Sequence, residues 1–190
     1  YFTRTPDVLV TDHLGAALAK SLMLLAERIE SEPGNVALRG EIMWACKLAH
    51  DNTVGFGRKH DWASHGIAHE IAVLYDTVHG ATLATVFPAW MQVAAEIEPE
   101  RLHRFAVQVM DIDPSENIQE DIKQGIEKYK SFLHRIGMPT TLKELGLPDS
   151  SKLKEIAAKS VQYMQSGTLG NFIRLDPASI HKLLILANQE

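Results

Sequence analysis

The sequence predicts an all-α protein, a single bundle of roughly eight or nine helices. Apolar residues recur at three- and four-residue steps along most of the chain, which is the period of an amphipathic helix. Helix breakers and caps separate these segments, and no stretch has the alternating pattern of a strand. With 190 residues and no long linker or internal repeat, we expect one all-helical domain over residues 1–190.

The first two helices are delimited by a strong breaker. Apolar residues recur from Leu14 to Ile29, and the pattern stops at Pro33-Gly34. Asn35 can cap a second helix, because its side chain can accept a hydrogen bond from the first helical turn. The apolar face of that helix is expected to run from Leu38 to Ala49.

The next helices enclose the predicted centre of the bundle. A third helix is expected to start near residues 61–64 and to end at about Tyr75. A fourth follows Gly80 and is apolar nearly all round, which predicts a central buried helix. Pro99 suits the first turn of a fifth helix.

Four further helices complete the prediction. An apolar stripe predicts one helix within residues 115–136, and Thr141 with Glu144 forms a capping box for a short one. The last two are expected at 152–165 and 177–188, where Asp176 caps the latter and Pro177 occupies its first position.

The composition excludes several classes of protein. A net charge of −5 without a Lys/Arg cluster argues against nucleic-acid binding. No apolar run approaches the roughly 18 residues of a membrane span. The single cysteine, Cys46, cannot form an internal disulfide, so we expect a cytoplasmic protein. The chain begins with Tyr1 rather than methionine and is expected to be a fragment of a longer protein.

Histidines concentrate in one stretch and suggest a metal site. Four of the nine lie close together: His60, His65, His69 and His79. His65 and His69 are four residues apart, so on a helix they share a face with Cβ atoms about 6 Å apart and could bind one metal. Spacing alone therefore favours that pair, although an isolated helical pair is more often a surface or capping feature.

His79 can join the site only if the chain turns. On one continuous helix it would lie about 21 Å from His65. The residues from Asp76 to Gly80 suggest a break between helices, which would bring His79 back toward His65. A zinc-protease motif is excluded, because Val73 stands where its second histidine is required.

The same stretch carries a family resemblance. Residues 57–70 and 74–81, with His65, His69 and His79 at their particular spacing, resemble the signature of the iron-containing (group III) alcohol dehydrogenases, closest to the butanol dehydrogenase branch. The likeness continues through residues 35–49, 87–91 and 141–146, and so covers essentially the whole chain.

The resemblance implies a role for three histidines. Such proteins have an N-terminal dinucleotide-binding domain and a helical C-terminal domain of the dehydroquinate synthase-like fold, with a divalent metal between them. The metal ligands in such proteins are an Asp, a His four residues later and two more histidines. Those last two histidines correspond here to His65 and His79. His69 corresponds to a residue beside the nicotinamide, with a catalytic and cofactor-binding role in proton relay or ring positioning. The alternative for His69 is a hydrogen-bonded structural histidine.

The resemblance also defines what is missing. The Asp-x-x-x-His pair would precede Tyr1, so two ligands, the dinucleotide-binding domain and any G-x-G-x-x-G segment lie outside this chain. The intact protein is expected to transfer a hydride between a butanol-like primary alcohol or its aldehyde and NAD(P), as a homodimer. The expected metal is Fe²⁺, with Zn²⁺ or Ni²⁺ as alternatives, because imidazole suits all three. We expect this chain alone to be inactive.

Two other functions compete with this interpretation. The His60-Asp61 dipeptide suggests an HD-type metal phosphohydrolase, although a two-residue match is weak. A non-catalytic helical interaction module with incidental histidines is the third reading. Within the dehydrogenase reading, Asp61 and Trp62 are expected to cap and pack the third helix, and the remaining histidines to be solvated or structural.

Overall fold

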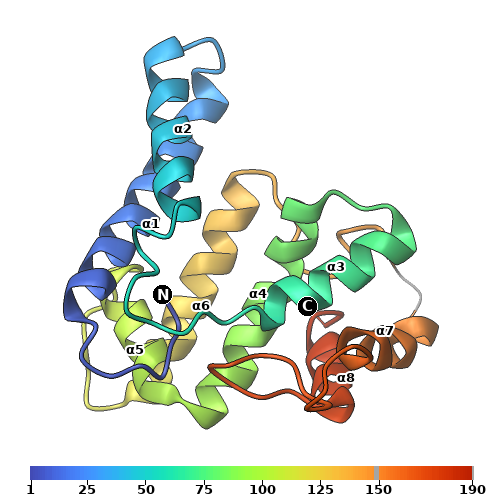
Figure 1. The fold of residues 1–190 in the computed structure, drawn as a ribbon. Coiled ribbons are helices and arrows are strands. Elements are labelled where there is room, and N and C mark those ends of the chain that lie inside the picture. The colour runs from blue at the N-terminus through green and yellow to red at the C-terminus, as the bar shows by residue number, and fades with distance from the viewer. Residues whose placement is uncertain (148–149, 190) are drawn as a thin grey trace.

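The computed structural model describes residues 1–147 and 150–189, and these form helices joined by turns (Figure 1). The helices are α1 (Leu9–Ser31), α2 (Val36–His50), α3 (Ala63–Tyr75), α4 (His79–Ile97), α5 (Pro99–Gln108), α6 (Ile118–Arg135), the 3₁₀ turn η1 (Ser150–Lys152), α7 (Leu153–Val161) and α8 (Pro177–Leu186). In these ranges the only strand-like pairing is one antiparallel bridge between Leu169 and Leu175. The prediction of an all-α fold is confirmed.

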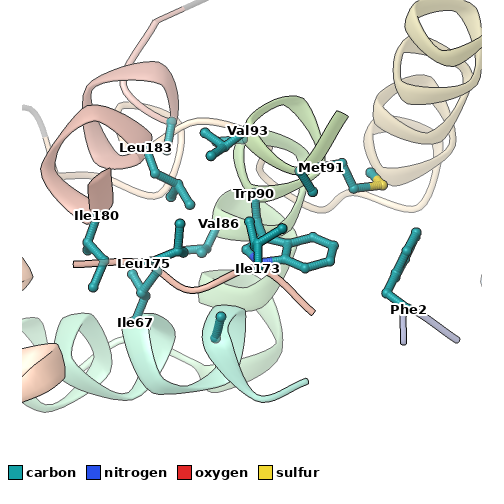
Figure 2. Packing of buried hydrophobic residues seen from close by; sticks show 14 of the residues in the cluster. Phe2, Ile67, Val86, Trp90, Met91, Val93, Ile173, Leu175, Ile180 and Leu183 are labelled. Carbon is teal, nitrogen blue, oxygen red and sulfur yellow. The ribbon is translucent and has the colours of Figure 1, made fainter. Parts of the chain in front are cut away.

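Helix α4 forms the centre of the domain, as its sequence predicted. It packs against α3, α5, α6 and α8. Val86, Trp90 and Met91 are almost completely buried along it. Figure 2 shows side chains of α3, α8 and the loop around Ile173 converging on this helix. Burial of this apolar surface, at roughly 25 cal/mol per Å², is the main source of stability for the fold.

Helix boundaries differ from the prediction at several places. The first helix begins at Leu9, five residues before the expected stripe, and the last two end at Val161 and Leu186. The short helix predicted from the Thr141–Glu144 capping box is wrong. Both capping hydrogen bonds form, at 3.1 and 3.3 Å. The segment nevertheless makes only a turn, because Gly146 adopts a left-handed backbone with φ 88° and ends it after a single turn.

Helices α1 and α2 form a hairpin that projects from the rest of the domain (Figure 1). Only Asp12 and Ala16 of α1, and Leu38 and Ala45 of α2, are buried. The predicted apolar faces are therefore only partly confirmed, since Leu14 and Ala49 at their ends are exposed. Ala19, Leu22, Met23 and Ala26 of α1 line a cavity.

One described helix, α1, is long and apolar enough to cross a membrane by length and composition alone, whereas the sequence analysis expected none. A single helix of this kind is weak evidence for a span, because core helices and signal sequences share these properties. Its buried Asp12 carboxylate forms ion pairs with arginines of two other segments, which ties the helix to the domain.

Candidate functional site

A sharp turn between α3 and α4 brings the predicted site residues together. Helix α3 ends at Tyr75; the next residue, Asp76, has a left-handed backbone (φ 52°, ψ 44°), and α4 begins at His79. The turn is held by the buried Thr82 hydroxyl, which donates to the Val78 carbonyl at 3.1 Å and lies 2.8 Å from the Thr77 hydroxyl. The expected break at residues 76–80 is confirmed, so His65 and His79 are not on one continuous helix.

Three imidazoles converge at this turn. The ring centres lie 6.4 Å apart for His65 and His69, 5.6 Å for His65 and His79, and 4.7 Å for His69 and His79. Two imidazoles that share a metal at about 2.1 Å per nitrogen have ring centres roughly 5 Å apart. The pair that helical spacing alone favours is thus the most widely separated of the three, and His79 is close to both of the others.

His65 has the most enclosed position of the three. It is half-buried, and the exposed Trp62 ring packs edge-on against it at 5.1 Å, whereas His69 and His79 are exposed. Burial lowers the pKa of His65, and the neighbouring His79 and His69 lower it further because a second positive charge would be repelled. A neutral imidazole is the form that binds a metal, so His65 is prepared for that role.

The three histidines alone do not make a complete metal site. Within residues 1–147 and 150–189, no group of three or more His, Cys, Asp or Glu side chains is arranged to hold a metal ion. Two imidazoles from α3 and α4 fit part of a divalent metal site, since nitrogen ligands suit iron(II), zinc and nickel. Further ligands would have to come from outside the described residues.

Asp61 fixes the start of α3 more strongly than a simple cap. Its Oδ1 accepts a hydrogen bond from the Ala63 amide at 2.7 Å, as expected for a residue at a helix start. Its Oδ2 accepts from the amides of Phe172 at 2.7 Å and Asn171 at 3.2 Å. The sequence analysis missed this second contact, because nothing in the local pattern links residues about 110 positions apart.

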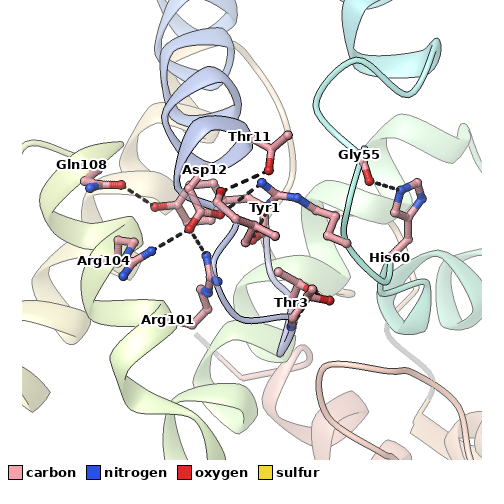
Figure 3. A network of polar contacts seen from close by, with 12 residues as sticks. Tyr1, Thr3, Thr11, Asp12, Gly55, His60, Arg101, Arg104 and Gln108 are labelled. Carbon is pink, nitrogen blue, oxygen red and sulfur yellow. Dashed lines mark hydrogen bonds and ion pairs between the residues drawn. The ribbon is translucent and has the colours of Figure 1, made fainter.

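Trp62 packs against the third helix as expected, through its ring contact with His65 at 5.1 Å, although 55% of the residue is exposed. It contacts the rings of His60 and His65 instead of the core. The His60 ring lies 3.3 Å from the Gly55 carbonyl oxygen (Figure 3). Because the Asp61 oxygens are already engaged by backbone amides, the pair His60-Asp61 does not form the metal site that a phosphohydrolase requires.

Other histidines have structural partners. His103 lies 2.9 Å from the buried Asp121 carboxylate, which also accepts from the Ser115 amide and hydroxyl. His134 lies 3.2 Å from Glu144. These contacts agree with the structural role expected for them.

A large cavity of about 980 Å³ opens beside His65. It extends from His65 and Trp62 to the aromatic residues of α4, α5 and α6. Burial raises the pKa of one of these, Tyr129, to about 12, so its phenol stays neutral. Two charged side chains, Arg58 and Asp61, also line this cavity. The cavity was not predicted from local patterns, because its walls come from segments far apart along the chain.

Comparison with known proteins identifies a common architecture. The family model described as Fe-containing alcohol dehydrogenase family, C-terminal, matches residues 2–187. Among curated proteins, the probable NADH-dependent butanol dehydrogenase 1 of Bacillus subtilis is 29% identical over 185 residues, which is 97% of this chain and 47% of that protein. The NADPH-dependent aldehyde reductase YqhD of Escherichia coli is 29% identical over 151 residues, or 80% of this chain and 39% of that protein.

Solved structures give the same picture. The crystal structure of NADH-dependent butanol dehydrogenase A from Thermotoga maritima superposes with a TM-score of 0.90 at 28% identity, covering 100% of this chain and 48% of that one. E. coli YqhD also gives a TM-score of 0.90, at 26% identity, covering 99% of this chain and 47% of that one. The chain thus spans about half the length of the relatives it matches.

Proposed function

Because this chain belongs to the Fe-containing alcohol dehydrogenase family, as its C-terminal part, we propose that it is the metal-binding half of an NAD(P)-dependent alcohol dehydrogenase. The reaction would be hydride transfer between a primary alcohol, or its aldehyde, and the nicotinamide. A butanol-like substrate is proposed because several relatives are named butanol dehydrogenases. The observation that carries the proposal is the convergence of three imidazoles at the α3–α4 turn.

We assign the metal to His65 and His79. His65 is half-buried with a lowered pKa, and His79 stands at the first position of the central helix α4, so both are held by rigid elements. Iron(II) is the proposed metal, with zinc and nickel as alternatives of similar ligand preference. When bound, a divalent metal would polarise the alcohol or aldehyde oxygen as a Lewis acid. Additional ligands, and the dinucleotide-binding domain, would come from the rest of the protein.

His69 is proposed to act beside the nicotinamide and to carry a proton or position the ring. Its imidazole is exposed next to His79, and it makes no side-chain hydrogen bond to another described residue. This role is proposed because the exposed imidazole has its ring centre 4.7 Å from that of His79 and can contact a group bound beside it.

The assignment can be tested on the full-length protein by measuring bound metal and activity. His65→Ala and His79→Ala should each lose most of the metal, because each removes a ligand. His69→Ala should retain the metal but lower kcat by roughly 10²-fold or more, as expected for loss of a proton-transfer group. His13→Ala, on the exposed surface of α1, is the matched control. Retention of metal by His65→Ala, or its loss from His69→Ala, would contradict the assignment.

The isolated 190-residue chain provides a second test. It should bind zinc or iron(II) only weakly, because two imidazoles supply half of a typical four-ligand site. Nanomolar affinity in a calorimetric titration would contradict this expectation, as would oxidation of NADH with butanal by the isolated chain. The homodimer proposed for the intact enzyme can be checked by sedimentation.

A further inference from the structure

His65 has no hydrogen bond that fixes the orientation of its ring. Among the described residues, neither of its ring nitrogens has a hydrogen-bond partner, whereas His60, His103 and His134 each lie within 3.3 Å of an oxygen. A metal-binding imidazole is ordinarily oriented by such a contact on its second nitrogen. In the described part of the chain, the orientation of His65 therefore depends on the rings around it.

Trp62 makes the closest of these ring contacts. Its ring centre lies 5.1 Å from that of His65, with an interplanar angle of 79°. The corresponding distances from His65 are 5.6 Å to His79 and 6.4 Å to His69. Aromatic rings prefer this edge-on arrangement, so the contact limits how far the imidazole can turn.

Trp62 is itself attached to a rigid part of the domain. It directly precedes α3, and its carbonyl accepts a hydrogen bond from the Gly66 amide at 2.9 Å. The neighbouring Asp61 carboxylate accepts from the Phe172 amide at 2.7 Å, which fixes the start of the helix. The His60 ring also lies 6.0 Å from the indole. The indole therefore has a fixed attachment, although 55% of the residue is exposed.

We propose that Trp62 is a positioning residue, whose indole holds the His65 imidazole in the orientation that lets His65 and His79 bind one metal. The inference rests on the proposed function, because it takes His65 to be a metal ligand. Trp62 is not a ligand itself, since its indole nitrogen is only a donor. A ligand ring that turns freely loses that freedom when the metal binds, so removal of the indole should weaken metal binding.

The test is calorimetric titration of the metal-free full-length protein with zinc. Trp62→Ala should bind zinc at least about tenfold more weakly than the wild type, the effect typical of groups that orient a metal ligand. Trp62→Phe keeps an aromatic edge at this place and should stay within about threefold of the wild type. The matched control is Trp44→Ala on α2, which removes the same side chain at 57% exposure and should leave zinc affinity unchanged.

The exposure of Trp62 means that its variants should remain folded, which circular dichroism checks. If Trp62→Ala nevertheless unfolds, Trp62→Leu provides the same test, because it keeps apolar bulk but removes the aromatic ring. Trp62→Leu should then lose at least about tenfold in zinc affinity. Zinc affinity equal to the wild type in either folded variant, or a loss in Trp62→Phe as large as theirs, would overturn the proposal.

A double substitution separates a positioning role from a merely structural one. When added to His65→Ala, Trp62→Ala should weaken zinc binding no further, because Trp62 acts only through His65. A further tenfold loss would overturn the proposal. If His65→Ala loses zinc and Trp62→Ala keeps it, only the positioning role is wrong. If His65→Ala itself keeps zinc, the proposed function fails and the inference fails with it.

Discussion

Replacement of Asp61 by asparagine tests how the site is held in place. The Asp61 carboxylate accepts three backbone hydrogen bonds, from Ala63, Phe172 and Asn171. Asparagine offers one acceptor oxygen, so its amide group must face at least one of these donors. The hydrogen bonds from Ala63 and Phe172 are partly buried, so water replaces a lost partner only in part.

The expected loss follows from these contacts. A buried amide left without an acceptor costs about 1–3 kcal/mol, so Asp61→Asn should lower the free energy of unfolding by about 2–3 kcal/mol. For a chain of this size that corresponds to a decrease in Tm of roughly 4–12 °C. Thermal and urea unfolding, followed by circular dichroism, measure both quantities.

The matched control is Asp176→Asn. Asp176 caps α8 by accepting from the Ser179 amide at 2.8 Å, and asparagine caps a helix about as well as aspartate. The control should therefore stay within about 0.5 kcal/mol of the wild type. If Asp61→Asn is as stable as the wild type, or if the control loses as much, the structural role assigned to Asp61 is wrong.

Three further substitutions test separate features. Gly125→Ala on α6 should lower the free energy of unfolding, measured in urea, by about 1–3 kcal/mol. The new Cβ at position 125 would lie 2.5 Å from the Ala106 Cβ and 2.9 Å from the Ala106 Cα on α5. Unchanged stability would refute this close packing. Asp76→Val should be destabilising by about 1–2 kcal/mol in the same assay, because the left-handed backbone at this position penalises a branched Cβ. Asp76→Gly should not be destabilising, because glycine adopts this conformation without strain. Equal stability of the two variants would contradict this reasoning. Hydrogen bonds from the Ser115 amide and hydroxyl lower the pKa of Asp121, so its stabilising effect is present above the unfolded pKa near 3.8 and is lost as pH falls through the folded pKa. The stability gap between wild type and Asp121→Asn should therefore close on acidification, and a gap independent of pH would refute the role of that charge.

Local signals in the sequence were sufficient for most of the helical framework. The all-round apolar pattern of α4 predicted its burial, and Asn35 caps α2 as expected by accepting from the Leu38 amide. The break between α3 and α4 was also predicted, and it is what places His79 near His65. Each of these features depends on residues within a few positions of one another, which a linear pattern can reveal.

Features that join distant segments could not be predicted in this way. The contact of Asp61 with Phe172, and that of Asp12 with Arg101, depend on how the helices pack and leave no periodic trace. The cavity beside Trp62 was not predicted for a related reason, because hydrophobicity predicts burial but does not reveal a cavity. Helical spacing favoured the pair His65 and His69. It could not predict the distance between His65 and His79, because that distance depends on the turn between the two helices.

The projecting α1–α2 hairpin has a consequence for the motions of the domain. With so few buried residues, it should open at a lower free energy than α4 and behave as a separate cooperative unit in hydrogen exchange. Leu22 and Met23 of α1 line the large cavity, so the wall of the cavity belongs to the least protected part of the molecule. Local opening of the hairpin would then expose the cavity wall at His65, while α4 and His79 remain folded.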